Sequence, residues 1–168
     1  LLYIFAEEAG KKISNVLTPK EVIGLVAELI GNNKDNNSLC DPVSGSGTLL
    51  VEVGKRVGIR GVGIFGQEAN WNQYALTKMN LMLNGFKDST FFWGDSLSNP
   101  KLTDGDRLKQ FDIVVSIPPF ADKWAIEEAE FDRYERFQYG IPPRSQATWA
   151  YISHILASLK PNGRAVVV

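Results

Sequence analysis

Residues 37–50 read Asn-Ser-Leu-Cys-Asp-Pro-Val-Ser-Gly-Ser-Gly-Thr-Leu-Leu. A short apolar run ends at Asp41, a glycine-rich turn follows, and a helical pattern begins near Thr48. Gly45 and Gly47 carry no Cβ atom, so a ligand can lie against the backbone of this turn. The first N–H groups of the next helix can bind a carboxylate or a phosphate. The stretch therefore predicts a first strand, a tight turn and a helix N-terminus, although two glycines alone also occur in plain connections.

Composition and charge place the chain among ordinary globular proteins. Its 168 residues suffice for one domain with a sizeable core, and hydrophobic and charged residues make up 44% and 22%. No apolar run approaches the roughly 20 residues that span a bilayer. Cys40 is the only cysteine and no secretory signal is visible, so we expect a cytoplasmic location without disulfides. The net charge of the chain is −1, so other segments or subunits would have to supply most of the phosphate contacts to a nucleic-acid substrate.

Strand and helix patterns alternate along the chain. Strands are predicted to end at Asp41 and to cover 59–65, 90–93, 111–117 and 165–168. A helix is predicted before the first strand and between all successive strands except those at 90–93 and 111–117. This alternation predicts an α/β fold, a doubly wound and mostly parallel sheet with helices on both faces. The chain stops inside an apolar run, so we expect a piece of a longer protein that ends after the fifth strand. Residues 1–14 have a short helical pattern of their own, and residues 98–110 are predicted to form a loop.

Apolar spacing predicts the buried face of each helix. Thr18 and Pro19 are suited to the first positions of a helix that Gly31 ends. Residues 121–146 have no clean periodicity and are expected to form a long excursion of helix and loop. The residues predicted to face the core are Val22, Leu25, Val26 and Leu29 in one helix, Leu76, Met79 and Leu83 with Met82 in another, and Trp149, Ile152, Leu156 and Leu159 in the last.

The glycines Gly61, Gly63 and Gly66 match the dinucleotide-binding pattern G-x-G-x-x-G. We reject this match because the glycines are predicted within a strand, whereas the functional pattern occupies the turn after one. Acidic residues at the strand ends are more informative. Asp41, Glu68 and Asp95 end three successive strands, and such ends meet at one edge of a parallel sheet. One such acid is commonly a helix cap, but three beside a glycine turn fit a ligand with several donors.

The spacing of these acids predicts what each one binds. Glu68 follows Gly47 by 21 residues, which is the spacing of an acid that accepts hydrogen bonds from ribose hydroxyls. Asp95 can accept a hydrogen bond from the amino group of adenine. The ligand is then an adenosine with a charged tail at the glycine turn.

Several motifs in this order resemble a known family. They are Leu-Thr-Pro at 17–19, Asp-Pro-x-x-Gly-Ser-Gly at 41–47, Gly-Gln-Glu at 66–68, Met-Asn-Leu-x-Leu-x-Gly at 79–85, Gly-Asp-Ser-Leu at 94–97 and Pro-Pro-Phe at 118–120. Together they resemble the N6-adenine DNA methyltransferase, or modification, subunit of type I restriction-modification systems, over residues 13–168. The resemblance implies a Rossmann-like catalytic domain at 1–168, dependent on S-adenosylmethionine (SAM), with residues 1–14 ending a preceding helical region. It implies DNA with a flipped adenine and the specificity and restriction subunits as partners.

The resemblance also assigns roles to particular positions. The catalytic positions would be Ile117, Pro118, Pro119 and Phe120, where the prolines meet the flipped adenine and Phe120 stacks on it. No metal is implied. The cofactor would be held by Val16, Leu17, Thr18 and Pro19 over its methionine end, Asp41 with Gly45, Ser46, Gly47 and Thr48 at its amino-acid group, Glu68 at the ribose, and Asp95 with Leu97 at the adenine.

Position 117 departs from the family, which has asparagine immediately before Pro-Pro. Acceptors around the adenine amine favour a pyramidal nitrogen whose lone pair points at the sulfonium methyl, and Ile117 cannot accept a hydrogen bond. One lost polar contact of this kind lowers a rate by roughly 10²–10³. We therefore expect cofactor binding without efficient catalysis. Alternatives are an inactive SAM-binding module of a complex, a methyltransferase acting on a protein or RNA amine or amide, and an NAD-dependent oxidoreductase, for which Pro-Pro-Phe has no purpose.

Other conspicuous residues are assigned structural roles. His154 has no cysteine or histidine partner, so a structural or surface role is expected rather than metal binding. Cys40 is expected to be a small buried apolar residue. Arg133, Arg136 and Arg144 are expected on a solvated face, with contacts to DNA phosphates as the alternative. The aromatic residues between 131 and 139 either cover the cofactor or face a partner subunit.

Overall fold

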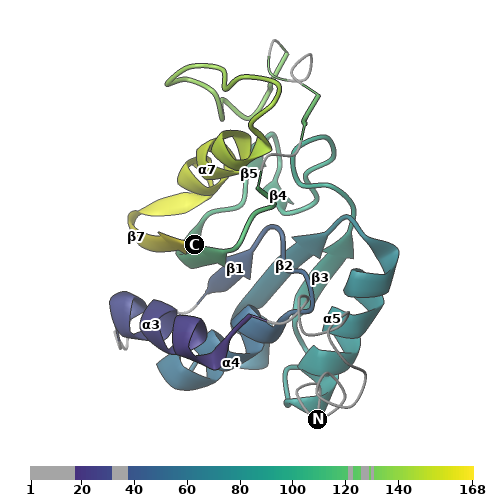
Figure 1. Cartoon of the computed structure of the whole chain (residues 1–168), viewed down its shortest axis with the longest axis vertical. Helices are drawn as coiled ribbons and strands as arrows, with labels where there is room; N and C mark the ends of the chain where they lie inside the picture. The colour runs from purple at the N-terminus through teal and green to yellow at the C-terminus, as the bar shows by residue number, and fades with distance from the viewer. Residues whose placement is uncertain (1–17, 32–37, 121–122, 126–128, 130) are drawn as a thin grey trace.

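The computed structural model describes residues 18–31, 38–120, 123–125, 129 and 131–168 (Figure 1). Among them a five-stranded sheet has the order β3-β2-β1-β6-β7, and each neighbouring pair is parallel. The predicted α/β fold is confirmed. Its strands are β1 (Leu39–Asp41), β2 (Ile64–Glu68), β3 (Thr90–Trp93), β6 (Phe111–Ser116) and β7 (Leu159–Val167).

Helices cover both faces of this sheet. On one face lie α3 (Lys20–Ile30), α4 (Thr48–Val57) and α5 (Trp71–Leu83), and on the other lies α7 (Ala147–Ala157) (Figure 1). A hydrophobic core lies on each face of the sheet, and successive residues of β6 pack into one core and then the other. Ile113 and Val115 pack with α3 and α4, while Val114 packs with Ile155 of α7. This alternation follows from the two-residue period of a strand. It explains why β6 is apolar almost throughout.

The strand order places a crevice in the middle of the sheet. From β1 the chain moves outward through α4, β2, α5 and β3, and then returns to pair β6 with the other side of β1. Leu39 of β1 therefore has Ile64 of β2 and Ile113 of β6 as parallel neighbours. The order reverses between β1 and β6, and ligands of such folds bind outside the carboxyl ends of the strands at this point. Asp41 and Ile117 stand at these two ends.

Three predictions of the buried helix faces are partly wrong. In α3, Leu25 and Leu29 are about 60% exposed, and in α5 Met79, Met82 and Leu83 are exposed by similar fractions. Apolar residues occur all round these helices, so their spacing did not identify the packed face. The residues that are buried are Ile23, Val26, Ala27 and Ile30 in α3, Thr77, Asn80 and Leu81 in α5, and Ala147, Ala150, Tyr151, His154 and Ile155 in α7, where Trp149 and Leu156 are exposed.

Some boundaries also differ from the predictions. Strand β2 begins at Ile64 instead of 59, because Gly61–Gly63 form a 3₁₀ turn that precedes it. The predicted loop at 98–110 contains a small antiparallel hairpin of β4 (Thr103–Asp104) and β5 (Arg107–Leu108). Strand β7 begins at Leu159, which was predicted to lie in the last helix, instead of at 165, and its register with β6 is irregular near its start. The helix predicted at 1–14 lies outside the described residues.

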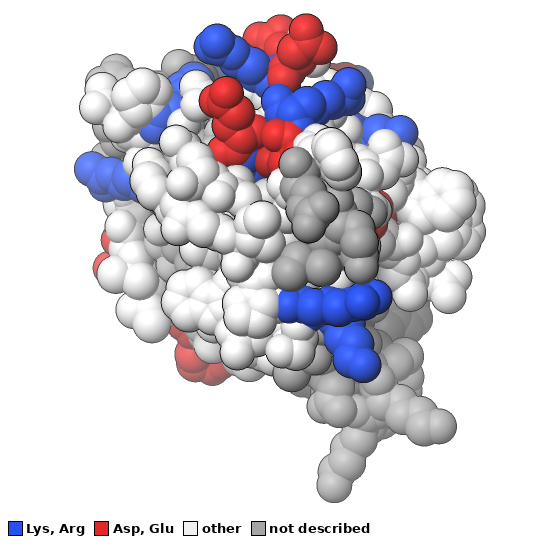
Figure 2. All heavy atoms as spheres, turned by 90° about the horizontal axis from the view of Figure 1, so that it is seen from above, with Lys and Arg blue, Asp and Glu red and all other residues white. Residues whose placement is uncertain are grey.

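The described surface carries charges of both signs. Seen from above, lysine, arginine, aspartate and glutamate side chains gather toward one edge, and much of the remaining described surface is uncharged (Figure 2). This distribution agrees with the net charge of −1. In the part of the chain that the structure describes, no helix is long and apolar enough to cross a membrane.

Candidate active site

The glycine turn between β1 and α4 is fixed in a conformation that requires glycine. Gly45 and Gly47 have φ of 55° and 72°, in the left-handed region that side chains with a Cβ disfavour. A Cβ on Gly47 would lie 2.5 Å from Cγ2 of Thr77, whereas a Cβ on Gly45 would meet no atom within 4 Å. Gly47 is therefore needed for close packing on α5, and Gly45 leaves open space beside the backbone.

Helix α5 holds the turn from behind. The Thr77 hydroxyl donates to the carbonyl of Gly45 at 2.6 Å, and the Asn80 amide donates to the carbonyl of Ser46 at 3.2 Å. These two hydrogen bonds anchor the backbone of the turn against α5. Thr77 and Asn80 lie three residues apart, on the same face of the helix. Their role was missed in the sequence, although Asn80 belongs to a motif that was noted there.

Asp41 is a buried carboxylate at the start of the turn. Its side chain is 1% exposed, and Oδ1 accepts hydrogen bonds from the Val43 N–H and the Ser116 hydroxyl, both at 2.9 Å. Burial raises the pKa of Asp41 to about 7, with a smaller upward contribution from the nearby Glu68 carboxylate, while the two hydrogen bonds act in the opposite direction. A cationic group beside Asp41 would restore its ionised form.

Glu68 closes the other side of the turn. Its Oε2 accepts from the Gly45 N–H at 2.8 Å, and its Oε1 accepts from the Asn70 N–H at 2.7 Å. Both carboxylate oxygens are therefore oriented by the backbone, and each keeps a second lone pair for another donor. The hydrogen bond to Gly45 places Glu68 directly against the turn that follows Asp41. The two acids thus lie on one edge of the sheet.

The Asp95 loop lies at the same edge. Asp95 Oδ1 accepts from the Leu97 N–H at 3.0 Å, as in an Asx turn, and Oδ2 accepts from the Ser98 hydroxyl at 2.9 Å. The Ser96 hydroxyl donates to the carbonyl of Pro42, and this bond joins the Asp95 loop to the Asp41 turn. The predicted meeting of the three carboxylate-bearing strand ends is therefore found in the structure.

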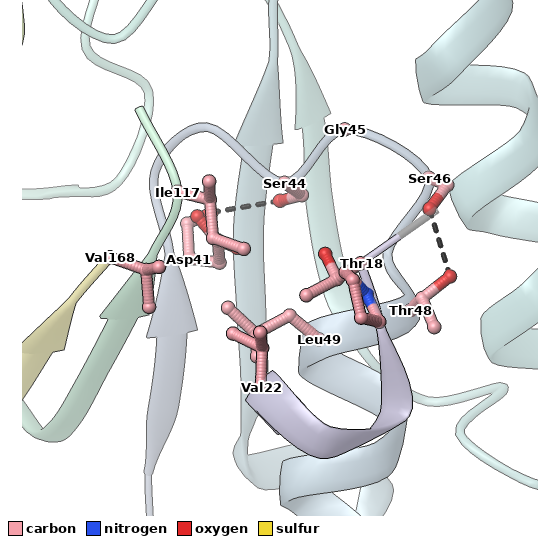
Figure 3. A pocket seen from close by; sticks show the side chains of 11 residues that line it. Thr18, Val22, Asp41, Ser44, Gly45, Ser46, Thr48, Leu49, Ile117 and Val168 are labelled. Carbon is pink, nitrogen blue, oxygen red and sulfur yellow. Dashed lines mark hydrogen bonds between the residues drawn. The ribbon is translucent and has the colours of Figure 1, made fainter. Parts of the chain in front are cut away.

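A cavity of about 370 Å³ opens beside the glycine turn. In Figure 3 the loop from Asp41 to Thr48 arches over it, with Asp41 and Ile117 at one end and Ser46 and Thr48 at the other. The hydroxyls of Ser46 and Thr48 share a hydrogen bond of 2.8 Å. The residues of the predicted site that line this cavity are Thr18, Pro19, Asp41, Gly45, Ser46, Thr48 and Ile117, while Val16 and Leu17 lie outside the described residues.

The Pro-Pro-Phe segment leaves β6 next to this cavity. Pro118 is buried, and the carbonyl of Pro119 accepts a hydrogen bond of 2.9 Å from the Thr148 hydroxyl of α7. Phe120 is 71% exposed, so its ring is free to meet a flat group from outside. Ile117 is half-buried and packs against the core that α3 and α4 share. Thus the backbone of this segment is held by α7 while its aromatic ring faces solvent.

Among the remaining polar residues, the prediction for Arg136 is wrong and the prediction for His154 is confirmed. Arg136 is 4% exposed and forms an ion pair with Asp132 at 2.8 Å, so it lies neither on a solvated face nor in reach of DNA phosphates. His154 is buried near Arg136, which confirms a structural place and excludes a surface one. Burial, and then the Arg136 charge, lower the pKa of His154 to about 3, so this imidazole is neutral. Cys40 is buried, as predicted.

No group of three metal-binding side chains was found among the described residues.

Some aromatic residues of the segment 121–146 are buried and others are exposed. Phe137 is buried and packs against Trp124 with ring centroids 5.1 Å apart, whereas Phe131 and Tyr139 are more than 80% exposed. The buried pair belongs to a small core with Leu97 and Tyr151, which lies against the Asp95 loop.

Sequence comparisons assign the chain to a family. The pattern of the N-6 DNA Methylase family matches residues 1–168. The methylase subunit of the type I restriction enzyme HindI from Haemophilus influenzae is 30% identical over 98% of this chain and 37% of its own length. The methylase subunit of MjaVII from Methanocaldococcus jannaschii is 33% identical over 93% of this chain and 28% of its own length. The chain therefore spans about a third of the curated relatives it matches.

Solved structures agree with this assignment. A type I restriction-modification methyltransferase subunit from Streptococcus thermophilus superposes with a TM-score of 0.76 and 27% identity, covering 90% of this chain and 33% of that one. A SAM-dependent methyltransferase from Thiobacillus denitrificans, solved with S-adenosylhomocysteine, superposes with a TM-score of 0.58 over 95% of this chain and 52% of that one. At 17% identity, the second likeness shows a shared fold alone.

Proposed function

The chain belongs to the N-6 DNA Methylase family, and we propose that residues 1–168 form the SAM-binding catalytic domain of a type I modification subunit. Its reaction is the transfer of a methyl group from SAM to N6 of adenine in DNA. The observation that carries this proposal is the edge of the sheet at which Asp41, Glu68 and Asp95 meet around the glycine turn. Type I methylase subunits among the relatives support the substrate class.

The residues at this edge fit the parts of SAM. The buried Asp41 carboxylate, whose pKa is raised to about 7, suits a partner with an ammonium group, and SAM carries one on its methionine part. The open space beside Gly45 admits the cofactor backbone at the turn. Glu68 presents two oriented carboxylate oxygens for the ribose hydroxyls, and Asp95 with Leu97 takes the adenine. Thr18 and Pro19 line the opposite wall, where we place the methionine end together with Val16 and Leu17.

The target base would be received by the Pro-Pro-Phe segment. Bound SAM would supply an electrophilic methyl group: as the new N–C bond forms, the bond between the methyl group and the sulfonium sulfur would break to leave S-adenosylhomocysteine, and the N6 amine would lose a proton to water. A base can be reached only after it leaves the duplex, and the exposed ring of Phe120 is placed to stack on it. The carbonyl of Pro118 then accepts a hydrogen bond from the N6 amine and helps to direct the nitrogen lone pair. Thr148 holds the neighbouring Pro119 carbonyl in place.

Ile117 limits catalysis in this form of the protein. Its side chain lines the cavity next to Asp41, where the related enzymes would have an amide acceptor, and an alkyl group accepts no hydrogen bond. Removing one preorganised polar contact from an active site costs about 2.7–4 kcal/mol in the barrier. We therefore propose normal SAM binding with methyl transfer that is slow or absent. An inactive SAM-binding module within a complex is the alternative that this observation favours.

Two measurements test the proposal. Titration calorimetry should detect SAM binding to the protein, and no binding of NAD. In the whole modification subunit, Ile117→Asn should raise the rate of methyl transfer to DNA by roughly 10²–10³, whereas Ile117→Leu should not change it. A rate that stays at background in Ile117→Asn would favour the inactive module. Absence of SAM binding would refute the proposal.

Family membership also supports our proposal for the acceptor and the partners. Pro-Pro-aromatic segments suit any planar amine or amide, so tritiated SAM should be offered with DNA, RNA and protein in parallel, and we expect label in DNA. On the face seen in Figure 2 the described residues carry charges of both signs. We therefore propose that specificity and restriction subunits contribute most of the phosphate contacts, and that the complex acts in the cytoplasm.

A further inference from the structure

Arg136 is the most completely buried cation among the described residues, and its surroundings are organised. Its guanidinium pairs with Asp132, through Nη2 at 2.8 Å and Nε at 2.9 Å, and it lies over the ring of Phe137. A buried arginine–aspartate pair contributes little net stability compared with apolar residues of the same size. We therefore infer the role of Arg136 from the other groups that its guanidinium binds.

These groups belong to the Asp95 loop. Arg136 Nη1 donates to the carbonyl of Leu97 at 2.8 Å and to the carbonyl of Ser96 at 3.2 Å. The two carbonyls immediately follow Asp95, whose side chain accepts from the Leu97 N–H. One guanidinium thus fixes the two peptide units on which the orientation of the Asp95 carboxylate depends.

Helix α7 supports the same arrangement. The Tyr151 hydroxyl lies 3.4 Å from Asp95 Oδ1, and His154 Nδ1 lies 3.4 Å from Arg136 Nη1. A neutral His154 presents a lone pair toward the guanidinium without a competing charge, which agrees with its low pKa. From the other side, Gln67 binds the loop further along, through Nε2 to the carbonyl of Asn99 at 2.9 Å. The loop is held at both ends, and Arg136 holds the end nearest to Asp95.

We propose that Arg136 is a positioning residue for adenine recognition, which presets the Asp95 loop so that the Asp95 carboxylate selects a ligand with a 6-amino group. This inference rests on the proposed function, in which Asp95 binds the adenine of SAM. The segment 131–139 would then contribute to cofactor specificity. This role differs from the two expected for its aromatic residues, which were covering the cofactor and facing a partner subunit.

The test compares S-adenosylhomocysteine with S-inosylhomocysteine, in which an oxo group replaces the 6-amino group. Both dissociation constants are measured by calorimetry on the whole protein, for the wild type and for Arg136→Met. The wild type should prefer the adenosyl ligand by about 10–100-fold, because the 6-oxo group of the inosyl ligand is an acceptor and cannot donate to the half-buried Asp95 carboxylate. In Arg136→Met this preference should fall below about threefold, mainly through weaker binding of the adenosyl ligand.

Matched variants separate positioning from folding. Arg133→Met changes an exposed arginine of the same segment, which contacts Tyr134, and should leave the preference unchanged. In Arg136, Nε and Nη2 bind Asp132 while Nη1 binds both carbonyls. Arg136→Lys keeps a charge for Asp132, but its single ammonium cannot bind Asp132 and the carbonyls in this way, so it should melt near the wild type and still lose most of the preference. If Arg136→Met does not fold, the ligand preference of Arg136→Lys tests the proposal in its place.

Each outcome has a defined meaning. A wild type that binds neither ligand, or binds both equally, refutes the proposed function of Asp95 and this inference with it. A wild type that discriminates, together with a folded Arg136→Lys that discriminates equally well, leaves the proposed function intact and overturns the role of Arg136.

Discussion

Replacing Gly47 by alanine should damage the cofactor turn in a predictable way. Alanine at φ 72° costs about 1–2 kcal/mol in backbone conformation. Its Cβ would also lie 2.5 Å from Cγ2 of Thr77, and forcing an extra methyl group into a packed site costs about 1–3 kcal/mol. The expected loss of folding free energy is therefore about 2–5 kcal/mol. For a chain of this length each kcal/mol lowers Tm by about 2–4 °C.

Gly45 provides the matched control, because it has φ of 55° but no atom within 4 Å of an added Cβ. Gly45→Ala should lose about 1–2 kcal/mol, which is the conformational part alone. Thr77→Ser removes Cγ2 and keeps the hydroxyl that binds the Gly45 carbonyl. In the Gly47→Ala background, Thr77→Ser should therefore restore about 1 kcal/mol or more, measured as a coupling free energy in a double-mutant cycle.

The assay is urea unfolding followed by circular dichroism, with thermal melting as a second measurement. The reasoning would be refuted by equal losses in the two alanine variants, or by strictly additive effects of Gly47→Ala and Thr77→Ser. SAM affinity measured on the same samples should fall in both variants, in Gly45→Ala because the new Cβ enters the space that admits the cofactor, and in Gly47→Ala because the turn is displaced from α5.

Two other predictions concern charge and packing. Because the pKa of Asp41 is raised to about 7, its contribution to folding stability is greatest below its ordinary pKa of 3.8 and is lost as the pH rises through 7. Cofactor binding has the opposite dependence, so calorimetry should show SAM affinity weakening by up to about tenfold per unit below pH 7, and Asp41→Asn should remove this slope. Leu81→Ala should lower the free energy of unfolding, measured by chemical denaturation, by about 2–5 kcal/mol. Met82→Ala, at an exposed position, should change it by no more than about 0.5 kcal/mol. Similar losses in the two variants would contradict the packing described for α5.

Local patterns were enough to predict the parallel sheet and the contents of its carboxyl edge. A strand, a glycine turn and a helix are encoded within residues 37–50, and strand ends of a parallel sheet necessarily meet at one edge. For this reason the sequence alone predicts that Asp41, Glu68 and Asp95 lie close together. Their roles toward SAM remain predictions that the proposed binding experiments test.

The packed faces of the helices could not be derived in this way. Helix α5 carries Leu76, Met79, Met82 and Leu83 as well as Leu81, and apolar residues on several faces give no single periodic stripe. Burial of Thr77 and Asn80 in place of the methionines depends on the carbonyls of the glycine turn, which lie more than 30 residues away in the chain. A tertiary hydrogen bond therefore decided the orientation of this helix.

The sequence by itself determined the order of the elements and the acids at their ends, because those features depend on neighbouring residues. Only the tertiary structure decided what holds these acids in place. Arg136 reads as one more surface charge in the sequence, yet the folded chain buries it against the carbonyls of Ser96 and Leu97, which lie 39 to 40 residues earlier. A buried cation needs partners, and partners this distant in the chain are set by the packing of whole elements rather than by any local pattern.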